Sequence, residues 1–203
     1  MTCTLPQEQI EQSIAFHGHS CPGLAIGIRA AELARERFGA VAPASLVAVT
    51  ETDMCGVDAI QFLTGCTYGK GNFIHKDFGK MAFSFYDRES GRGFRAVLNP
   101  TARIADYVEM HDLMKKVVGG TATEQEKARS DALRAAQEKH YMQLPLEEVF
   151  RVAEMTAPPP RPARILESLK CGQCGEMTME SRTRRFDGKT LCIPCFEQVE
   201  QKV

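Results

Sequence analysis

Two pairs of cysteines near the end of this sequence limit its possible folds more than any other feature. The first pair lies in Cys171-Gly172-Gln173-Cys174, and Cys192-Ile193-Pro194-Cys195 follows after 17 intervening residues. Two C-x-x-C pairs at such a separation are typical of a tetrahedral zinc site with four thiolate ligands. Below about 40 residues a domain buries too little apolar surface to fold unaided, so the metal would supply much of the stability.

The residues around these pairs predict how the module is built. Asp187-Gly188 is a hairpin turn signal, and the residues from Cys195 to Glu200 are typical of a helix. A knuckle, a hairpin and a helix that holds the last two ligands predict a treble-clef arrangement. The alternative, a thioredoxin-like dithiol, needs a βαβ context that is absent here. Arg182, Arg184 and Arg185 are compatible with a contact surface, although a solvated hairpin face explains them more simply.

A stiff, proline-rich stretch, Ala157-Pro158-Pro159-Pro160-Arg161-Pro162, separates this module from the rest of the chain. We therefore expect a core domain over residues 1–156, a linker over 157–168 and the zinc-binding domain over 169–203.

A second group of metal-ligating residue types lies in the segment FHGHSCPG at residues 16–23. Because proline favours the first helical position, Pro22 predicts a helix whose N-cap is Cys21. A thiol there feels the positive end of the helix dipole, which favours the thiolate. A single His or Cys is commonly a satisfied core residue. Three of them at one helix entrance, His17, His19 and Cys21, favour a functional site.

Cys55 is predicted to lie at a second helix N-terminus, since it follows a buried strand and precedes a helix. With His17, His19 and Cys21 it offers enough nitrogen and sulfur ligands for a second divalent metal, with zinc expected. We expect Asp53 to orient one of the imidazoles. Four protein ligands would indicate a structural site. Three with an open position would indicate catalysis, for which Cys55 is the candidate residue.

Cys66 belongs to a different feature, the loop GCTYGKGN at residues 65–72. If residues 55–66 form one helix, their ends lie about 16 Å apart. Thiolates on one zinc lie within about 4 Å of each other, so Cys66 cannot share the metal of Cys55 within one copy of the chain. The loop lacks the Walker spacing. Its amides with Cys66, Thr67 and Lys70 could hold an anionic cofactor group, or the loop could be a simple turn. We expect it to share a pocket with Cys55.

Apolar periodicity and turn residues predict a mixed helix and sheet core before the linker. Thr123 and Glu126 have the spacing of a capping box, and residues 146–155 fit either a short helix or a strand. Helices are expected over 7–15, 23–38, 57–64 and, with a break at Gly119-Gly120, over 102–140; strands are expected over 46–51, 73–75, 81–86 and 93–98.

Charge and hydropathy exclude several classes of protein. The formal net charge is −1, which provides no global field for nucleic acid or an anionic membrane. No apolar run approaches the ~20 residues that span a bilayer, and the N-terminus lacks the features of a signal peptide. The eight cysteines lie mostly in C-x-x-C pairs or beside glycines, which indicates metal-binding or catalytic thiols. We expect a cytoplasmic protein with neither membrane nor nucleic-acid partners.

Three segments together resemble a known family. FHGHSCPG at residues 16–23, DMCGVDAIQ at 53–61 and GCTYGKGN at 65–72 closely resemble the FmdE family of formylmethanofuran dehydrogenase proteins, over about residues 10–155. The resemblance implies an α+β core, often dimeric, with a treble-clef zinc finger as an auxiliary domain. It also implies association with a molybdenum- or tungsten-dependent formylmethanofuran dehydrogenase, which reduces carbon dioxide to a formyl group on methanofuran.

The chain has no ferredoxin-like cysteine run and no evident molybdopterin site, so it cannot carry out that redox chemistry by itself. The leading hypothesis is a metal-binding protein with an accessory or ligand-binding role in one-carbon metabolism. The alternative is a small metalloenzyme or thiol-dependent enzyme acting on an anionic one-carbon or pterin-like substrate.

Overall fold

The computed structural model describes residues 2–39, 41–42 and 44–199, and it divides the chain into two compact units, Met1–Pro162 and Ala163–Val203. The division falls inside the stretch predicted as a linker. In order along the chain, the first unit contains α1 (Gln7–His17), α2 (Pro22–Phe38), β1 (Leu46–Thr50), α3 (Gly56–Thr64), β2 (Phe73–His75), β3 (Ala82–Asp87), β4 (Gly93–Leu98), α4 (Tyr107–Val118), α5 (Glu124–Gln143), α6 (Leu146–Val149) and β5 (Phe150–Glu154).

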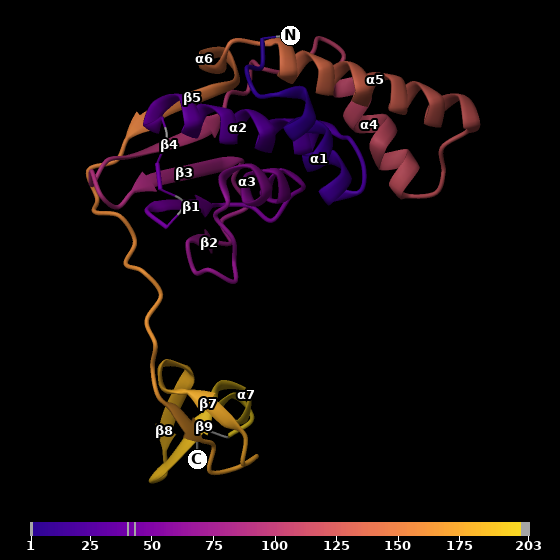
Figure 1. Ribbon diagram of the computed structural model, residues 1–203. Helices are drawn as coiled ribbons and strands as arrows, with labels where there is room; N and C mark the ends of the chain where they lie inside the picture. The colour runs from indigo at the N-terminus through magenta and orange to yellow at the C-terminus, as the bar shows by residue number, and fades with distance from the viewer. Residues whose placement is uncertain (1, 40, 43, 200–203) are drawn as a thin grey trace. The chain divides into compact units, whose positions relative to one another are not determined.

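The strands of this unit form one five-stranded sheet in the order β2-β1-β3-β4-β5 (Figure 1). β1 and β2 run parallel because α3 carries the chain back between them, whereas the other neighbours are antiparallel. A tight turn joins the antiparallel strands β3 and β4. Helices and a mixed sheet in one unit confirm the expected α+β class.

The main core lies between this sheet and α2. Successive side chains of a strand lie on opposite faces of the sheet. Ala48, Phe83 and Phe94 therefore lie on the face that α2 covers, while Val47 and Tyr86 lie on the opposite face. From Leu24 to Ala34 every residue of α2 is buried. Helices α1, α3, α5 and α6 also pack on α2, which explains why no face of it is left to solvent.

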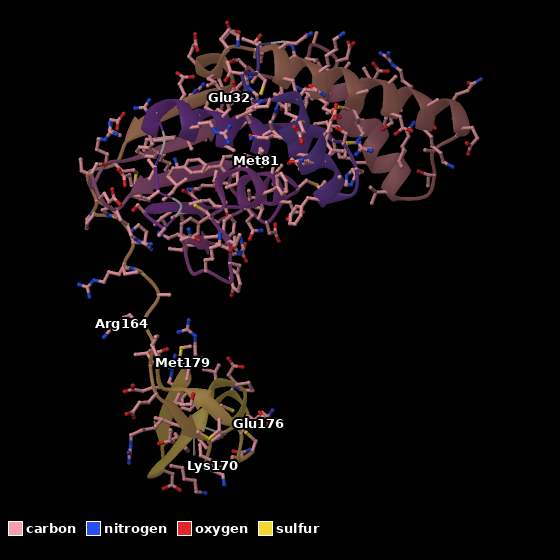
Figure 2. All side chains as sticks on the ribbon, in the orientation of Figure 1. Glu32, Met81, Arg164, Lys170, Glu176 and Met179 are labelled. Atoms are coloured by element: carbon pink, nitrogen blue, oxygen red, sulfur yellow. The ribbon has the colours of Figure 1, made fainter. Side chains whose placement is uncertain are left out.

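An ion pair lies inside this packing, and apolar periodicity gave no sign of it. Arg29 contacts Glu32 one turn along α2 at 2.9 Å, and both side chains are at most 3 % exposed (Glu32 is labelled in Figure 2). Arg29 also donates to the carbonyl oxygen of Leu144, and Glu32 accepts from the backbone N–H and the hydroxyl of Thr4. The pair therefore joins the N-terminal segment and the end of α5 to the central helix.

Local signals placed most helix ends correctly. Cys21 caps α2, Gly65 ends α3 in a left-handed conformation, and Thr123 with Glu126 forms the full capping box of α5. The segment 146–155, which fitted either a helix or a strand, contains one of each, because the short helix α6 leads directly into strand β5. The expected helix over 102–140 begins only at Tyr107, and α1 extends two residues beyond its predicted end, to His17.

The second unit is small and consists of short elements. β6 (Ser168–Lys170) pairs with β7 (Met177–Met179) around the first two cysteines, and a 3₁₀ turn, η1 (Glu180–Arg182), follows. β8 (Thr183–Phe186) and β9 (Lys189–Cys192) then form a hairpin through Asp187-Gly188, before α7 (Ile193–Glu197). The predicted last helix therefore begins two residues earlier than expected, and its far end at Glu200 lies outside the described residues.

None of the helices in the described part of the chain combines the length and apolar character needed to cross a membrane.

Candidate metal centre

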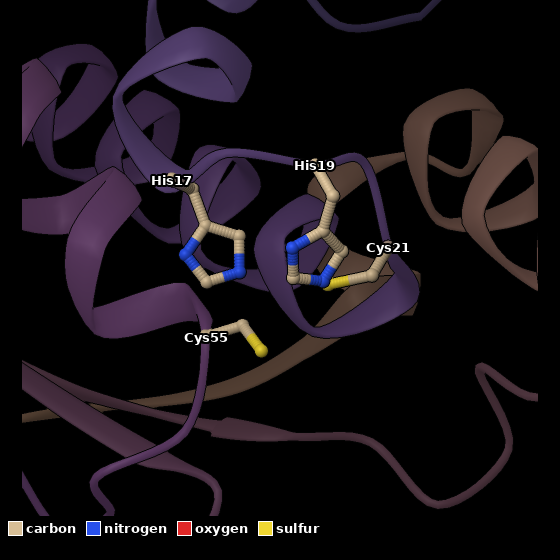
Figure 3. A group of neighbouring side chains, drawn as sticks. All are labelled: His17, His19, Cys21 and Cys55. Carbon is tan, nitrogen blue, oxygen red and sulfur yellow. The ribbon is translucent and has the colours of Figure 1, made fainter.

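Four side chains of the first unit converge on one point (Figure 3). His17 is the last residue of α1, His19 lies in the following loop, Cys21 caps α2, and Cys55 precedes α3. One ligand atom from each lies within 4.8 Å of all the others. The structure thus brings together all four residues that the sequence proposed as core metal ligands.

A contact between three glycines explains why the two cysteines meet. A Cβ placed on Gly27 would lie 2.1 Å from the carbonyl oxygen of Gly56, and one placed on Gly56 would lie 2.8 Å from that of Gly23. Because none of these residues has a side chain, the backbones at the starts of α2 and α3 touch directly. Cys21 and Cys55 occupy the N-cap positions of these two helices, so the glycine contact fixes their separation.

Cys21 is held by its own helix. Its Sγ accepts a hydrogen bond from the backbone N–H of Leu24 at 3.3 Å, as an N-cap side chain does. Burial nevertheless raises the pKa of the Cys21 thiol, with the neighbouring Cys55 adding to this and the amide of Leu24 opposing it. The sequence argument expected the helix dipole to favour the thiolate, but burial outweighs it. A cation at the cluster would reverse the balance by displacing the proton.

His17 is oriented by a carboxylate that the sequence did not single out. Its Nδ1 lies 2.7 Å from Oδ2 of Asp58, on the first turn of α3. The sequence proposed Asp53 for this task, but Asp53 is exposed and lines another hollow with Thr50 and His75. Asp58 prevails because it lies beyond Cys55, on the helix that faces α1.

The remaining nitrogen of His17 indicates what the cluster can hold. Nε2 is buried, and no group among the described residues hydrogen-bonds to it. When Nδ1–H donates a hydrogen bond to Asp58, the lone pair of Nε2 is free to bind a metal, as in carboxylate–histidine–metal arrangements. Tetrahedral zinc needs nitrogen and sulfur ligands about 3.3–3.8 Å apart, so atoms that all lie within 4.8 Å of one another would need to close in by about 1.5 Å at most. The residues present therefore fit a divalent metal of zinc type.

A cavity of about 330 Å³ opens beside the two cysteines. Its walls come from the start of α2, from Met81 and Leu98 at the edge of the sheet, and from α4 and α5 (Met81 is labelled in Figure 2). Tyr141 is one of its lining residues, and burial raises the pKa of its phenol to about 12, so the phenol stays protonated. The candidate metal centre thus has space for a small molecule next to it.

The loop at residues 65–72 borders a different surface depression. Thr67 and Lys70 line a depression with Phe16, Phe62 and Tyr68, and the ammonium group of Lys70 donates to the carbonyl oxygen of Gly65 at 2.8 Å.

Cys66 is fully buried, its Sγ lies 3.4 Å from the carbonyl oxygen of Leu46, and burial raises the pKa of its thiol. The residues described on the cavity beside Cys55 include neither Thr67 nor Lys70. The shared pocket expected from the sequence is thus not seen, and an anion bound by the loop stays a prediction.

In the second unit the four predicted cysteines also meet, with their sulfur atoms within 4.8 Å of one another. The backbone N–H of Cys192 donates to Sγ of Cys171, which lowers the pKa of that thiol to about 6. The pKa of Cys195 is raised to about 12, chiefly by its neighbour Cys192. Amide donors thus favour one thiolate, and four ionised thiols at one point require a cation.

Comparison with known proteins finds a family model for each unit. A family model described as FmdE, molybdenum formylmethanofuran dehydrogenase operon, matches residues 16–151. The chain belongs to this family. A second model, the prokaryotic DksA/TraR C4-type zinc finger, matches residues 164–201, so the four cysteines of the second unit are those of a zinc finger.

Two individual proteins are similar to this member of the FmdE family. A probable S-adenosyl-L-methionine-binding protein of Archaeoglobus fulgidus is 32% identical over 192 residues, which are 89% of this chain and 50% of that protein. The chain spans about half the length of this curated relative. An FmdE-like protein of Syntrophus aciditrophicus, named for tungsten formylmethanofuran dehydrogenase, has a similar fold, with a TM-score of 0.62 and 24% identity over 94% of this chain and 91% of that one.

Sequence reasoning missed the cavity of this FmdE-family unit. Its far walls include Tyr107, Met110 and Tyr141, which lie about 50 to 90 residues beyond Cys55 in the chain. Met110 and Tyr141 repeat at helical spacing with other apolar residues, which predicts a buried helix face but not an unfilled space. No local signal in the sequence would have revealed the cavity.

Proposed function

We propose that the FmdE-family unit binds a divalent metal, zinc in the first place, through His17, His19, Cys21 and Cys55, and holds a small ligand in the cavity beside it. The observation that carries this proposal is the buried, unpartnered Nε2 of His17, whose other nitrogen is held by Asp58. Together with the family, it favours an accessory or ligand-binding role in one-carbon metabolism.

A small metalloenzyme is the second candidate, and the position of Cys55 supports it. Bound zinc would act as a Lewis acid if a small molecule could replace one of the four protein ligands. Both cysteines line the cavity, but Cys21 is held by the amide of Leu24, whereas the side chain of Cys55 makes no capping hydrogen bond. Cys55 is thus the residue best placed to leave the metal when a ligand arrives.

S-Adenosylmethionine enters as a ligand to be tested. The name of the Archaeoglobus protein implies that it binds this molecule, but that protein has twice the matched length, so the binding site can lie in either half. Titration of the present chain with S-adenosylmethionine, followed by calorimetry, would show whether this half is sufficient.

The remaining expectations rest on the family and on composition. We propose a homodimer that associates with the components of formylmethanofuran dehydrogenase in the cytoplasm, where the eight cysteines would stay reduced; all eight are free in the structure. The order of knuckle, hairpin and short helix favours a treble-clef finger. Sedimentation at micromolar concentration would test the dimer.

Metal counting by mass spectrometry tests the proposed function. The purified chain should carry about two zinc ions, and His17→Ala and Cys55→Ser should each carry about one. His75→Ala is the matched control, since His75 is an exposed imidazole at the end of β2. A wild-type chain that carries one zinc ion after purification in excess zinc would contradict the core site.

A further inference from the structure

Two arginines, Arg103 and Arg134, are among the residues that line the cavity beside Cys21 and Cys55. Arg103 lies just before α4, and its guanidinium lies 4.0 Å from the centre of the Tyr107 ring, which is also in the cavity wall. Arg134 projects from α5. Two cations from different elements thus reach one space.

Among the described residues, neither of these arginines makes the paired hydrogen bonds to a carboxylate that Arg95 and Arg129 make. Arg95 forms two hydrogen bonds of 2.6 and 2.7 Å to Glu51, and Arg129 forms two of 2.8 and 2.7 Å to Glu109. Arg134 reaches only Asp131, at 3.9 Å, which is too long for a hydrogen bond. Arg103 forms no ion pair with any residue in the described part of the chain, so both guanidiniums have donors to offer.

No described residue that lines the cavity carries a carboxylate. If the proposed zinc ion is bound, its two positive charges balance the thiolates of Cys21 and Cys55, and the metal centre contributes no net charge. The charged groups among the described lining residues are then the two arginines, with the carboxylate of Asp131 3.9 Å from Arg134.

Most of the rest of the wall is apolar. Met81, Leu98, Met110 and Met114 supply aliphatic and thioether surface. The amide oxygen of Gln137 accepts from Ile104, and its amide nitrogen donates to the carbonyl oxygen of Ala102. The described lining residues thus offer an anionic group two cationic partners, the arginines, besides the neutral hydroxyls of Tyr107 and Tyr141.

We propose that this cavity selects a small molecule with an aromatic or apolar body and an anionic group, a carboxylate or a phosphate, which Arg103 and Arg134 bind. Such a ligand would lie with its apolar part against the methionines and extend toward Cys55. Its position beside a metal rests on the proposed function; the choice of an anion does not. S-Adenosylmethionine has a carboxylate that the arginines could bind, but its sulfonium and ammonium cations would find no carboxylate among the described lining residues.

Three probes of one shape test the charge preference: 2-naphthoate, 2-naphthyl phosphate and the neutral 2-naphthamide. The sequence contains no tryptophan, so naphthyl fluorescence can be followed in the full-length chain with little background. For probes of this size we expect dissociation constants on the order of 0.1–1 mM. At least one anion should bind about tenfold more tightly than the amide, and the better anion identifies the group that the site prefers.

Substitutions then test which residues cause the preference for an anionic probe. Arg103→Gln and Arg134→Gln should each weaken the anion roughly five- to tenfold, since charge-assisted hydrogen bonds at a partly exposed site are lost. Neither should change binding of the amide. Met114→Glu, which adds a carboxylate to the wall at a half-exposed position, should act in the same direction. Lys139→Gln is the control, because it removes an exposed cation of α5 that is not among the lining residues.

Equal binding of the anions and the amide to the wild type would overturn the proposal, as would an anion preference that survives in the double arginine variant. Absence of binding by any probe at about 5 mM, well above the expected dissociation constants, would count equally against it. Zinc content measured on the same samples separates the two proposals. Arginine-dependent binding to a chain that lacks the core metal would disprove the metal centre and leave the ligand class standing.

Discussion

The two cysteine-containing clusters of this protein have similar dimensions but opposite relations to their surroundings. In the finger, the buried residues among those described are Leu191 and three of the four cysteines themselves. In the core, the cluster lies at the edge of a sheet-and-helix domain whose packing includes Leu24, Phe83 and Phe94, none of which is a proposed ligand. The finger cluster is thus the core of the second unit, whereas the first unit has a hydrophobic core that is separate from its cluster.

This difference shows what positions the ligands in each case. The finger has little apolar surface to order its cysteines, so metal binding and folding are expected to be one event. The FmdE-family unit holds its ligands with helix caps, a glycine contact and the Asp58 carboxylate before any metal arrives. Metal loss should unfold the finger and leave the core intact.

The largest effect should follow from breaking the finger. Cys171→Ser or Cys192→Ser should remove about one zinc ion per chain and unfold the second unit, because three thiolates and a hydroxyl hold zinc far more weakly. All four tyrosines lie in the first unit, so tyrosine fluorescence reports on that unit alone. Its unfolding midpoint in urea should stay unchanged. Retention of zinc in both variants would contradict the four-thiolate site.

The next largest effect should come from separating the two helix starts in the core. Gly27→Ala would place a Cβ 2.1 Å from the carbonyl oxygen of Gly56, so α2 and α3 must move apart. We expect a loss of about 1–3 kcal/mol in the free energy of unfolding, together with weaker core zinc binding, since Cys21 and Cys55 separate. Gly69→Ala is the matched control, because a Cβ there meets no atom within 4 Å. Urea titration and zinc analysis measure both.

A smaller effect, confined to the metal, should come from Asp58→Asn. The amide keeps the size of the carboxylate but weakens its hold on Nδ1 of His17, so core zinc affinity should fall roughly 10- to 100-fold. Stability without metal should hardly change, because Asp58 is 41% exposed. Asp53→Asn should leave the affinity unaltered. Competition with a zinc chelator measures it, and equal affinities for the two variants would remove Asp58 from the site.

The smallest effect tests stability that owes nothing to metal. Two hydrogen bonds from Arg95 hold the pKa of Glu51 below its usual range, against the opposing effect of burial. A carboxylate with a lowered folded pKa stabilises the fold above its unfolded pKa, and this contribution is lost as the pH falls through the folded value. Glu51→Gln should therefore cost about 1 kcal/mol at about pH 7 and less below about pH 4.5. Urea unfolding followed by tyrosine fluorescence, at both pH values, checks this.

Much of the local structure could be predicted because its signals are local. Pro22 placed Cys21 at a helix start, Gly65 ended α3, and Thr123 with Glu126 opened α5. The four proposed core ligands followed from the same reasoning, because Cys21 and Cys55 were each expected to begin a helix and the two histidines lie just before Cys21. Residue type and helix boundaries were sufficient to predict that these four side chains meet.

What the sequence could not reveal depends on contacts between distant segments. The burial of Arg29 and Glu32 requires Leu144 and Thr4 as partners, 115 and 28 residues away. The choice of Asp58 over Asp53 depends on which side of α3 faces α1, and the cavity exists only where α4 and α5 leave a gap beside α2. Periodicity fixes the faces of one helix but not which neighbours leave space between them.

The position of the four core ligands along the chain has a consequence for biosynthesis. His17, His19, Cys21 and Cys55 all precede α4 and α5 by some 50 residues or more, so every ligand is synthesised before either helix. Chains emerge at about 5–20 residues per second, which separates the two events by several seconds. A metal ion captured in that interval would join α1, α2 and α3 in the nascent chain, whereas the pocket beside it has no outer wall until Tyr141 is in place. Loading of a metal at the proposed site and access of a ligand to the cavity would thus be separated in time by the order of these segments along the chain.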